Sequence, residues 1–229
     1  MSLETTDRHI TIVMYHYVRN LEHSRYPEIK GLGATDFREQ IGYIRKHYNV
    51  ISGDELIAAV ETSGELPSRP LVLTFDDAYV DHFTEVFPLL KDEGLPGCFF
   101  PPARCIREKR VLDVNKIHFT LAAVEDKSTL VEEIYEMPDS CRREFRLRRN
   151  EEYWEKLAHP SRFDPAEVVF IKRALQRELP ETLRNRIVDA PFSQVRDRGR
   201  ERFCNGAVHV GGPDCGPRRG GHVHRQPRL

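Results

Sequence analysis

The stretch Leu71-Val-Leu-Thr-Phe-Asp-Asp-Ala-Tyr-Val80 decides the expected fold. Its first five residues are apolar apart from Thr74, which is typical of a strand buried on both faces of a sheet. Pro70 introduces the strand, and two adjacent carboxylates, Asp76 and Asp77, follow it. In α/β folds, ligands and catalytic groups lie where such strands end. The stretch therefore predicts a buried strand that delivers two carboxylates to a site.

Alternating apolar and amphipathic runs surround this strand between residues 10 and 101. Short apolar runs separated by segments of helical period are typical of βα units around a parallel sheet. The sequence therefore predicts an α/β fold. The expected strands are residues 10–15, 49–51, 71–75 and 97–101, and the last of these is expected to be buried.

Three helices are expected between these strands. Two begin at capping boxes, in which the N-cap side chain and a glutamate three residues later cap each other's backbone amides. The first box is Asp36 with Glu39, and the second is Ser52 with Glu55. The third helix ends at Gly94. Its expected core-facing stripe consists of Val80, Phe83, Phe87 and Leu90.

The sequence becomes charged and helix-forming between about residues 107 and 188, with hardly any strand signal. Its clearest element begins at Asp164, the expected N-cap, with Pro165 at the first helical position. Residues 142–156 are crowded with Arg and Glu, and their mixed signs favour a solvated helix over a binding face. We interpret the whole segment as a helical insertion or flank.

Composition argues against several kinds of partner and location. The 229 residues carry 35 basic and 36 acidic side chains, so the net charge of −1 gives no reason to expect nucleic acid or an anionic membrane. Near the N-terminus, Glu4 and Asp7 stand where a secretory signal needs basic residues. No run is long enough to span a membrane, and the five cysteines include no Cys-x-x-Cys pair. We therefore expect a cytoplasmic protein with reduced thiols.

The two adjacent aspartates admit two interpretations. Successive side chains of an extended segment point to opposite sides, so one carboxylate can bind a cation while its neighbour acts as a base. An aspartate between a strand and a helix can instead cap the first helical amides. The spacing of Asp76 and Asp77 does not decide between these roles.

Three segments together resemble the polysaccharide deacetylase family, which has a NodB-homology domain. They are Thr74-Phe-Asp-Asp77, Met14-Tyr-His-Tyr-Val18 on the first strand and Gly97-Cys-Phe-Phe-Pro101 on the next strand. The resemblance covers roughly residues 9–119. It departs from the family motif at Ala78, where the family has glycine. If that position needs a positive φ angle, the methyl group costs on the order of 1 kcal/mol.

The resemblance implies a distorted parallel (β/α) barrel, which we expect to be incomplete and to cover residues 1–205. The charged helical segment at about 107–188 is expected to be an insertion in it, and the composition of residues 206–229 predicts an irregular, disordered tail. The resemblance also implies a hydrolase that uses a divalent metal, usually zinc, to remove acetyl groups from an acetylated sugar or polysaccharide. By the family motif, Asp76 is the catalytic base and Asp77 is a metal ligand.

A site of this kind needs two metal histidines, which the family takes from a His-(Ser/Thr)-x-x-x-His or similar segment. No intact copy is found. The pair His222-Val-His224 has the wrong spacing, His118 fits a structural role on an apolar helical face, and the role of His82 stays open. His16, at the end of the first strand, is expected to line the pocket. The other expected pocket residues are Tyr15, Thr74 and Tyr79.

The last part of the chain has an unusual composition. Residues 196–229 hold 8 Arg, 7 Gly and only 5 large apolar residues, too few for a packed element. With common GC-rich codons, reading from the second base of the His209 codon can give MSADQIAALVEAGMYTVSHG. That string has a helical stripe and ends in Ser-His-Gly, much like the family's approach to its metal histidines. We therefore hypothesise a shift of reading frame between Phe203 and His209.

The leading interpretation is a metal-dependent deacetylase that is truncated and impaired in this chain. The alternative is a catalytically inactive remnant that binds carbohydrate or a partner protein. Magnesium-dependent phosphoryl transfer by the paired acids is weaker, because no Asp-x-Asp nucleophile pattern or phosphate-binding glycine loop accompanies them.

Overall fold

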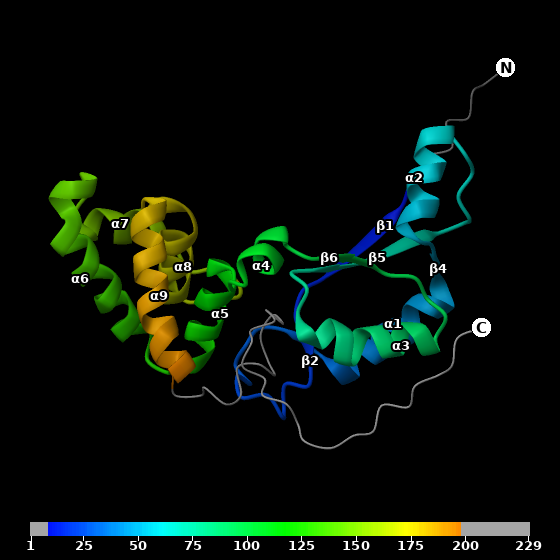
Figure 1. Cartoon of the computed structure of the whole chain (residues 1–229), viewed down its shortest axis with the longest axis horizontal. Coiled ribbons are helices and arrows are strands. Elements are labelled where there is room, and N and C mark those ends of the chain that lie inside the picture. The colour runs from blue at the N-terminus through cyan, green and yellow to red at the C-terminus, as the bar shows by residue number, and fades with distance from the viewer. Residues whose placement is uncertain (1–8, 198–229) are drawn as a thin grey trace, which may run out of the picture.

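The computed structural model describes residues 9–197, with side chains to residue 189 (Figure 1). A parallel sheet forms around β5, which pairs with β1 on one side and with β4 and β6 on the other. The expected strands are therefore confirmed. Their bounds are β1 (Thr11–Tyr15), β4 (Asn49–Val50), β5 (Pro70–Asp76) and β6 (Cys98–Phe100), and a separate parallel pair joins β2 (Val18–Arg19) to β3 (Leu32–Gly33).

Helices alternate with the strands in the first half and follow one another in the second (Figure 1). Those of the first half are α1 (Ala34–His47), α2 (Gly53–Thr62), the π-helix η1 (His82–Val86) and α3 (Phe87–Asp92). Those of the second half are α4 (Ala103–Glu108), α5 (Asp113–Ala123), α6 (Lys127–Phe145), α7 (Asn150–Leu157), α8 (Ala166–Arg173), the π-helix η2 (Ala174–Glu178) and α9 (Glu181–Asp197). The expected helical character of residues 107–188 is confirmed.

One face of the sheet packs against α1 and α3. Leu73 and Phe75 of β5 are fully buried on this face, together with Phe37 of α1 and Leu90 of α3. The ring of Phe75 stacks on that of Tyr15, with ring centroids 5.3 Å apart, and meets the edge of Phe37 at 6.0 Å. This aromatic contact joins β1, β5 and α1 in one core.

The opposite face of the sheet is open in the described part of the chain. Paired residues of neighbouring parallel strands point to the same face, so Met14 shares this face with Thr74, and Asp76 shares it with Phe100. Met14 is 61% exposed, and Ile12 and Phe100 are each 57% exposed. A closed barrel would bury these side chains, but residues 9–197 form an open sheet.

The exposure of β6 contradicts the expectation of a buried strand at residues 97–101. Phe99 is 39% exposed and Phe100 is 57% exposed. The physical reason is that β6 pairs only with β5 among the described strands, so it lies at the edge of the sheet.

The expected stripe of the third helix is wrong in phase. Phe83 is 74% exposed and Phe87 is 47% exposed, while Val86 is buried. The helix begins with the π-helix η1, whose wider turn rotates the side chains after it, including Phe87, relative to an α-helix. Leu90 is buried as expected, and Gly94 follows the end of α3 with a φ angle of 65°.

One of the two capping boxes is confirmed. Ser52 and Glu55 cap each other's backbone amides at the start of α2. The box of Asp36 and Glu39 is wrong, because α1 begins earlier, after Gly33, and has no side-chain cap. Asp36 lies inside the first turn of α1, where its negative charge interacts favourably with the helix dipole.

Asp164 does not cap its helix as expected. The N-cap of α8 is Pro165, and the Asp164 carboxylate instead accepts hydrogen bonds from Lys30 and from Lys172, the latter at 2.7 Å. These two ammonium groups hold the pKa of Asp164 below its usual value, although burial acts in the opposite direction. The residue thus ties α8 to the segment between β2 and β3.

Cys98, Cys105 and Cys141 are free thiols. Among residues 9–197, no helix has the length and apolar character needed to cross a membrane. Cys204, Cys215 and the expected irregular tail at 206–229 lie outside the described residues.

Replacing Phe37 tests the core. Phe37→Ala should lower the free energy of unfolding by about 3–5 kcal/mol, because Phe37 is fully buried against Tyr15 and Phe75. Tyr43→Ala on the same helix is the matched control and should cost less than about 1 kcal/mol, because Tyr43 is 58% exposed. Urea unfolding measures both, and equal losses would contradict this description of the core.

Candidate active site

β5 ends in a turn that carries both carboxylates. Asp76 is the last residue of β5, and the next two residues have positive φ angles, 72° at Asp77 and 50° at Ala78. Aspartate visits this left-handed region more readily than most residues, whereas a methyl group there costs on the order of 1 kcal/mol. The positive φ considered for Ala78 is confirmed, and the one at Asp77 was missed.

Asp76 lies beside His16 at the carboxyl edge of the sheet. His16 directly follows β1 and Asp76 ends the neighbouring strand, so strand pairing brings them together. Nε2 of His16 is 4.0 Å from Oδ2 of Asp76, and the two side chains are 45% and 31% exposed. A carboxylate with this access to water is suited to accept a proton from it.

Asp77 makes a different contact. Its Oδ2 accepts a 2.6 Å hydrogen bond from the hydroxyl of Tyr79, which is almost fully buried. Burial is the main cause that raises the pKa of Tyr79 above its ordinary value, and the neighbouring Tyr17 and Asp77 add to it. Tyr79 therefore stays protonated and donates to the Asp77 carboxylate throughout the neutral range.

Asn115 of α5 extends this contact into the helical segment. Its Nδ2 donates to the hydroxyls of Tyr79, at 2.7 Å, and Tyr17, at 3.3 Å. Tyr17 in turn lies 3.4 Å from Nδ1 of His118. A continuous series of polar contacts thus joins Asp77 to α5.

An ion pair holds the segment just after the turn. The guanidinium of Arg19 in β2 pairs with Asp81, and both residues are buried. Burial raises the pKa of Asp81 and outweighs the opposite effect of Arg19. Arg19 also lies over the rings of Tyr17 and Phe119, 5.2 and 5.6 Å from their centroids.

His82 is a structural residue in this arrangement. Its Nε2 lies 2.6 Å from the carbonyl oxygen of His16, and its ring is buried between Phe75 and Tyr79. Burial lowers the pKa of His82, so the neutral ring donates from Nε2. The sequence left the role of His82 open, and this placement shows that the role is structural.

Two of the expected pocket residues lie apart from the carboxylates. Tyr15 packs in the core, and its hydroxyl donates to Gln40 Oε1 at 3.1 Å. Thr74 shares the sheet face of Asp76, but its Oγ1 donates to the carbonyl oxygen of Val13 at 3.3 Å. The structure brings His16 to Asp76 and Tyr79 to Asp77, and it leaves Tyr15 and Thr74 in supporting positions.

The described residues do not fit a complete zinc site. Zinc in proteins is held by three or four nitrogen, sulfur or oxygen ligands arranged around one point. Within residues 9–197, no group of three or more His, Cys, Asp or Glu side chains is arranged to hold a metal ion. His82 and His118 are engaged in the contacts above, and His222 and His224 lie outside the described residues.

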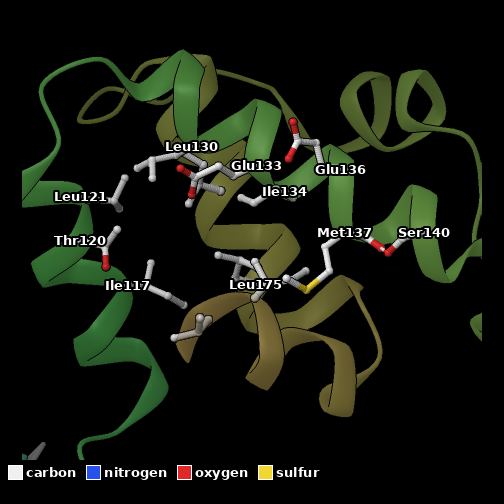
Figure 2. Close-up of a pocket in the computed structure, with 13 residues that line it drawn as sticks. Ile117, Thr120, Leu121, Leu130, Glu133, Ile134, Glu136, Met137, Ser140 and Leu175 are labelled. Atoms are coloured by element: carbon white, nitrogen blue, oxygen red, sulfur yellow. Dashed lines mark hydrogen bonds between the residues drawn. The ribbon is translucent and has the colours of Figure 1, made fainter. Parts of the chain in front are cut away.

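Hollows in the described surface lie both near the carboxylates and far from them. A cleft of about 390 Å³ adjoins the turn and is lined by Ala78, Tyr79, Val80, His82, Phe83, Phe87, Phe99 and Pro101. A second hollow of about 460 Å³ lies among the helices of the second half (Figure 2). It is mostly apolar, with Glu133, Glu136 and Ser140 among its lining residues. The helices that line it, among them α6 and α9, lie far from β5 (Figure 1).

Asn115 and Tyr17 were not among the expected site residues. Asn115 could have been noticed as a polar side chain in the same helix as Ile117 and Phe119, because a buried amide needs hydrogen-bond partners. Nothing in the local sequence indicated that those partners would be tyrosines from the first half of the chain, which forms the sheet and is called the sheet half below.

Part of the chain is similar in sequence to known enzymes. No family profile matches the chain. A match of 69 residues at 33% identity links it to the poly-beta-1,6-N-acetyl-D-glucosamine N-deacetylase of Escherichia coli K12, and the enzyme of E. coli O157:H7 matches equally. Over this stretch the chain is similar to these polysaccharide deacetylases. The match covers 30% of this chain and only 10% of either relative, so the chain spans about a tenth of their length.

Solved deacetylase structures overlap parts of the chain. A de-N-acetylase from Aggregatibacter actinomycetemcomitans is 26% identical, with a TM-score of 0.35 over 40% of this chain and 37% of that one. IcaB from Ammonifex degensii is 22% identical, with a TM-score of 0.36 over 50% and 52%. PplD, a Streptococcus pyogenes deacetylase in complex with acetate, is 16% identical, with a TM-score of 0.38 over 58% and 68%. At these TM-scores the overlaps are partial, and the relationship rests on the sequence match.

The placement of His82 predicts a pH dependence. Because burial lowers its pKa in the folded state, the unfolded chain takes up a proton first as the pH falls below about 6.5. The stability contributed by neutral His82 is complete above that pH and is lost as the pH falls through the folded pKa. His82→Gln keeps a side-chain N–H donor without titrating and should flatten part of this slope.

Urea unfolding between pH 5 and pH 8 measures that slope. His159→Gln, a change at an exposed histidine, is the control and should leave the slope as it is in the wild type. An unchanged slope in His82→Gln would contradict the structural role of His82.

Proposed function

We propose that this chain carries part of the active site of a hydrolase that removes acetyl groups from acetylated sugars, with Asp76 as the base and Asp77 as a metal ligand. The observation that carries the proposal is the pair of carboxylates on a positive-φ turn at the carboxyl end of β5. The related E. coli enzymes are named for removing acetyl groups from an N-acetylglucosamine polymer. An acetylated polysaccharide is therefore the substrate class to test.

The two carboxylates are suited to different tasks. Asp76 is accessible to water and lies near His16, so it can take a proton from an attacking water. Asp77 has one oxygen held by Tyr79, which restricts its direction as a metal ligand requires. Helix capping has no support here, because η1 begins without a side-chain cap and the Asp77 carboxylate bonds a side-chain hydroxyl.

The proposed site is incomplete in residues 9–197. Asp76, Asp77 and His16 are not arranged around one point as zinc ligands are, so this chain alone is proposed to be impaired. We attribute the missing histidines to a shifted reading frame between Phe203 and His209. That part of the proposal rests on the sequence, because these residues lie outside the described range.

Activity and metal content test the proposal together. The chain as printed should release no measurable acetate from acetylated polysaccharide, even with zinc or cobalt supplied, because two carboxylates without histidines do not activate a water at neutral pH. A chain with the frame restored after about Phe203 and extended through the downstream sequence should gain both zinc and activity. Asp77→Ala in that chain should remove the metal.

Sequencing the gene is the first check. A shifted frame that soon meets a stop codon, without a further histidine, would overturn the frame hypothesis. A restored chain that binds carbohydrate but releases no acetate would favour the inactive remnant over the enzyme.

A further inference from the structure

The side chain of Asn115 occupies an unusual place for a polar group. It is fully buried, with 0% of the residue exposed, in the interface between α5 and the sheet half of the chain. Its Nδ2 donates to Tyr79 and Tyr17, while its Oδ1 is buried without a hydrogen-bond partner. A buried acceptor without a partner costs stability. The two hydrogen bonds that the amide donates are therefore expected to have a role that offsets this cost.

We propose that Asn115 is a positioning residue for the site, which fixes the direction of the Tyr79 hydroxyl and through it the orientation of the Asp77 carboxylate. The proposal rests on the proposed function only in taking Asp77 as a carboxylate of the site. It assigns to the helical segment a part in building the site that was not expected from the sequence.

Hydrogen-bond directions support this role. A carboxylate only accepts, so the hydroxyl hydrogen of Tyr79 must point to Asp77. The lone pairs of the same hydroxyl then face Asn115, which must present its N–H and not its carbonyl oxygen. With the amide reversed, its carbonyl oxygen would compete with the Asp77 carboxylate for the one hydroxyl hydrogen of Tyr79. The observed orientation of the amide removes this competition.

Ion pairs keep Asn115 in place. Its neighbour Lys116 is 5% exposed and binds Asp113 at 2.7 Å and Asp189 of α9 at 2.6 Å. Phe119, one turn further along α5, packs its ring against that of Tyr26, with centroids 5.0 Å apart. Together these contacts tie α5 both to α9 and to the sheet half, and so fix the position of Asn115 relative to Tyr79.

Side-chain couplings of Asp77, measured by NMR on the full chain without metal or substrate, test the proposal. Wild type should show the three-bond couplings of a single χ1 rotamer. Tyr79→Phe, which removes the donor, and Asn115→Leu, which removes the amide, should both show couplings averaged over several rotamers. Tyr153→Phe is the matched control, because it removes a buried hydroxyl that accepts a hydrogen bond from Arg148, and it should leave Asp77 unchanged.

Each outcome decides the proposal. Single-rotamer couplings of Asp77 in a folded Asn115→Leu protein would overturn it, even if the variant is less stable, because a purely structural role lowers stability without freeing Asp77. If Asn115→Leu does not fold, Asn115→Ala replaces it, since it also removes the amide and adds no bulk. Averaging is expected there too, and its absence would also overturn the proposal.

The test is independent of deacetylation. A chain that binds no metal and releases no acetate would contradict the proposed function while leaving the rotamer result intact. Conversely, an active restored chain with an unchanged Asp77 rotamer in the variants would support the function and refute the role of Asn115.

Discussion

The pairing of β5 with strands on both of its sides is the interaction on which the described structure depends. Residues 71–75 bond to β1, the start of β5 bonds to β4, and its end bonds to β6. A shift of register by one residue would turn Leu73 and Phe75 out of the core and break these ladders at once. The point at which β5 ends is therefore fixed, and with it the position of Asp76.

Two halves of the chain meet at that strand end. The sheet half brings Asp76 and His16 to one edge through strand pairing. The helical half reaches the same edge through Asn115, whose contact with Tyr79 holds Asp77. The open sheet face beside this edge carries exposed apolar side chains in the described part of the chain.

Local signals in the sequence predicted the elements better than their packing. The apolar run of β5 and the box of Ser52 and Glu55 are short-range features, and both are confirmed. The phase of the third helix depended on a π-turn, and the partners of Asp164 come from distant segments, so neither could be read locally. The same holds at the site: strand order brought His16 to Asp76, whereas the contacts of Asn115 arise only from tertiary packing.

Titration of the chain with zinc, followed by NMR of the backbone amides, shows whether the end of β5 is a metal site. We expect weak binding, seen only at high zinc concentration, that shifts resonances of the turn at Asp76 and Asp77 and of His16, because carboxylates at this edge attract a cation but lack the histidines to hold it. Tight stoichiometric binding would show that the chain completes a metal site by itself. Shifts confined to other surfaces would show that the end of β5 is not the site.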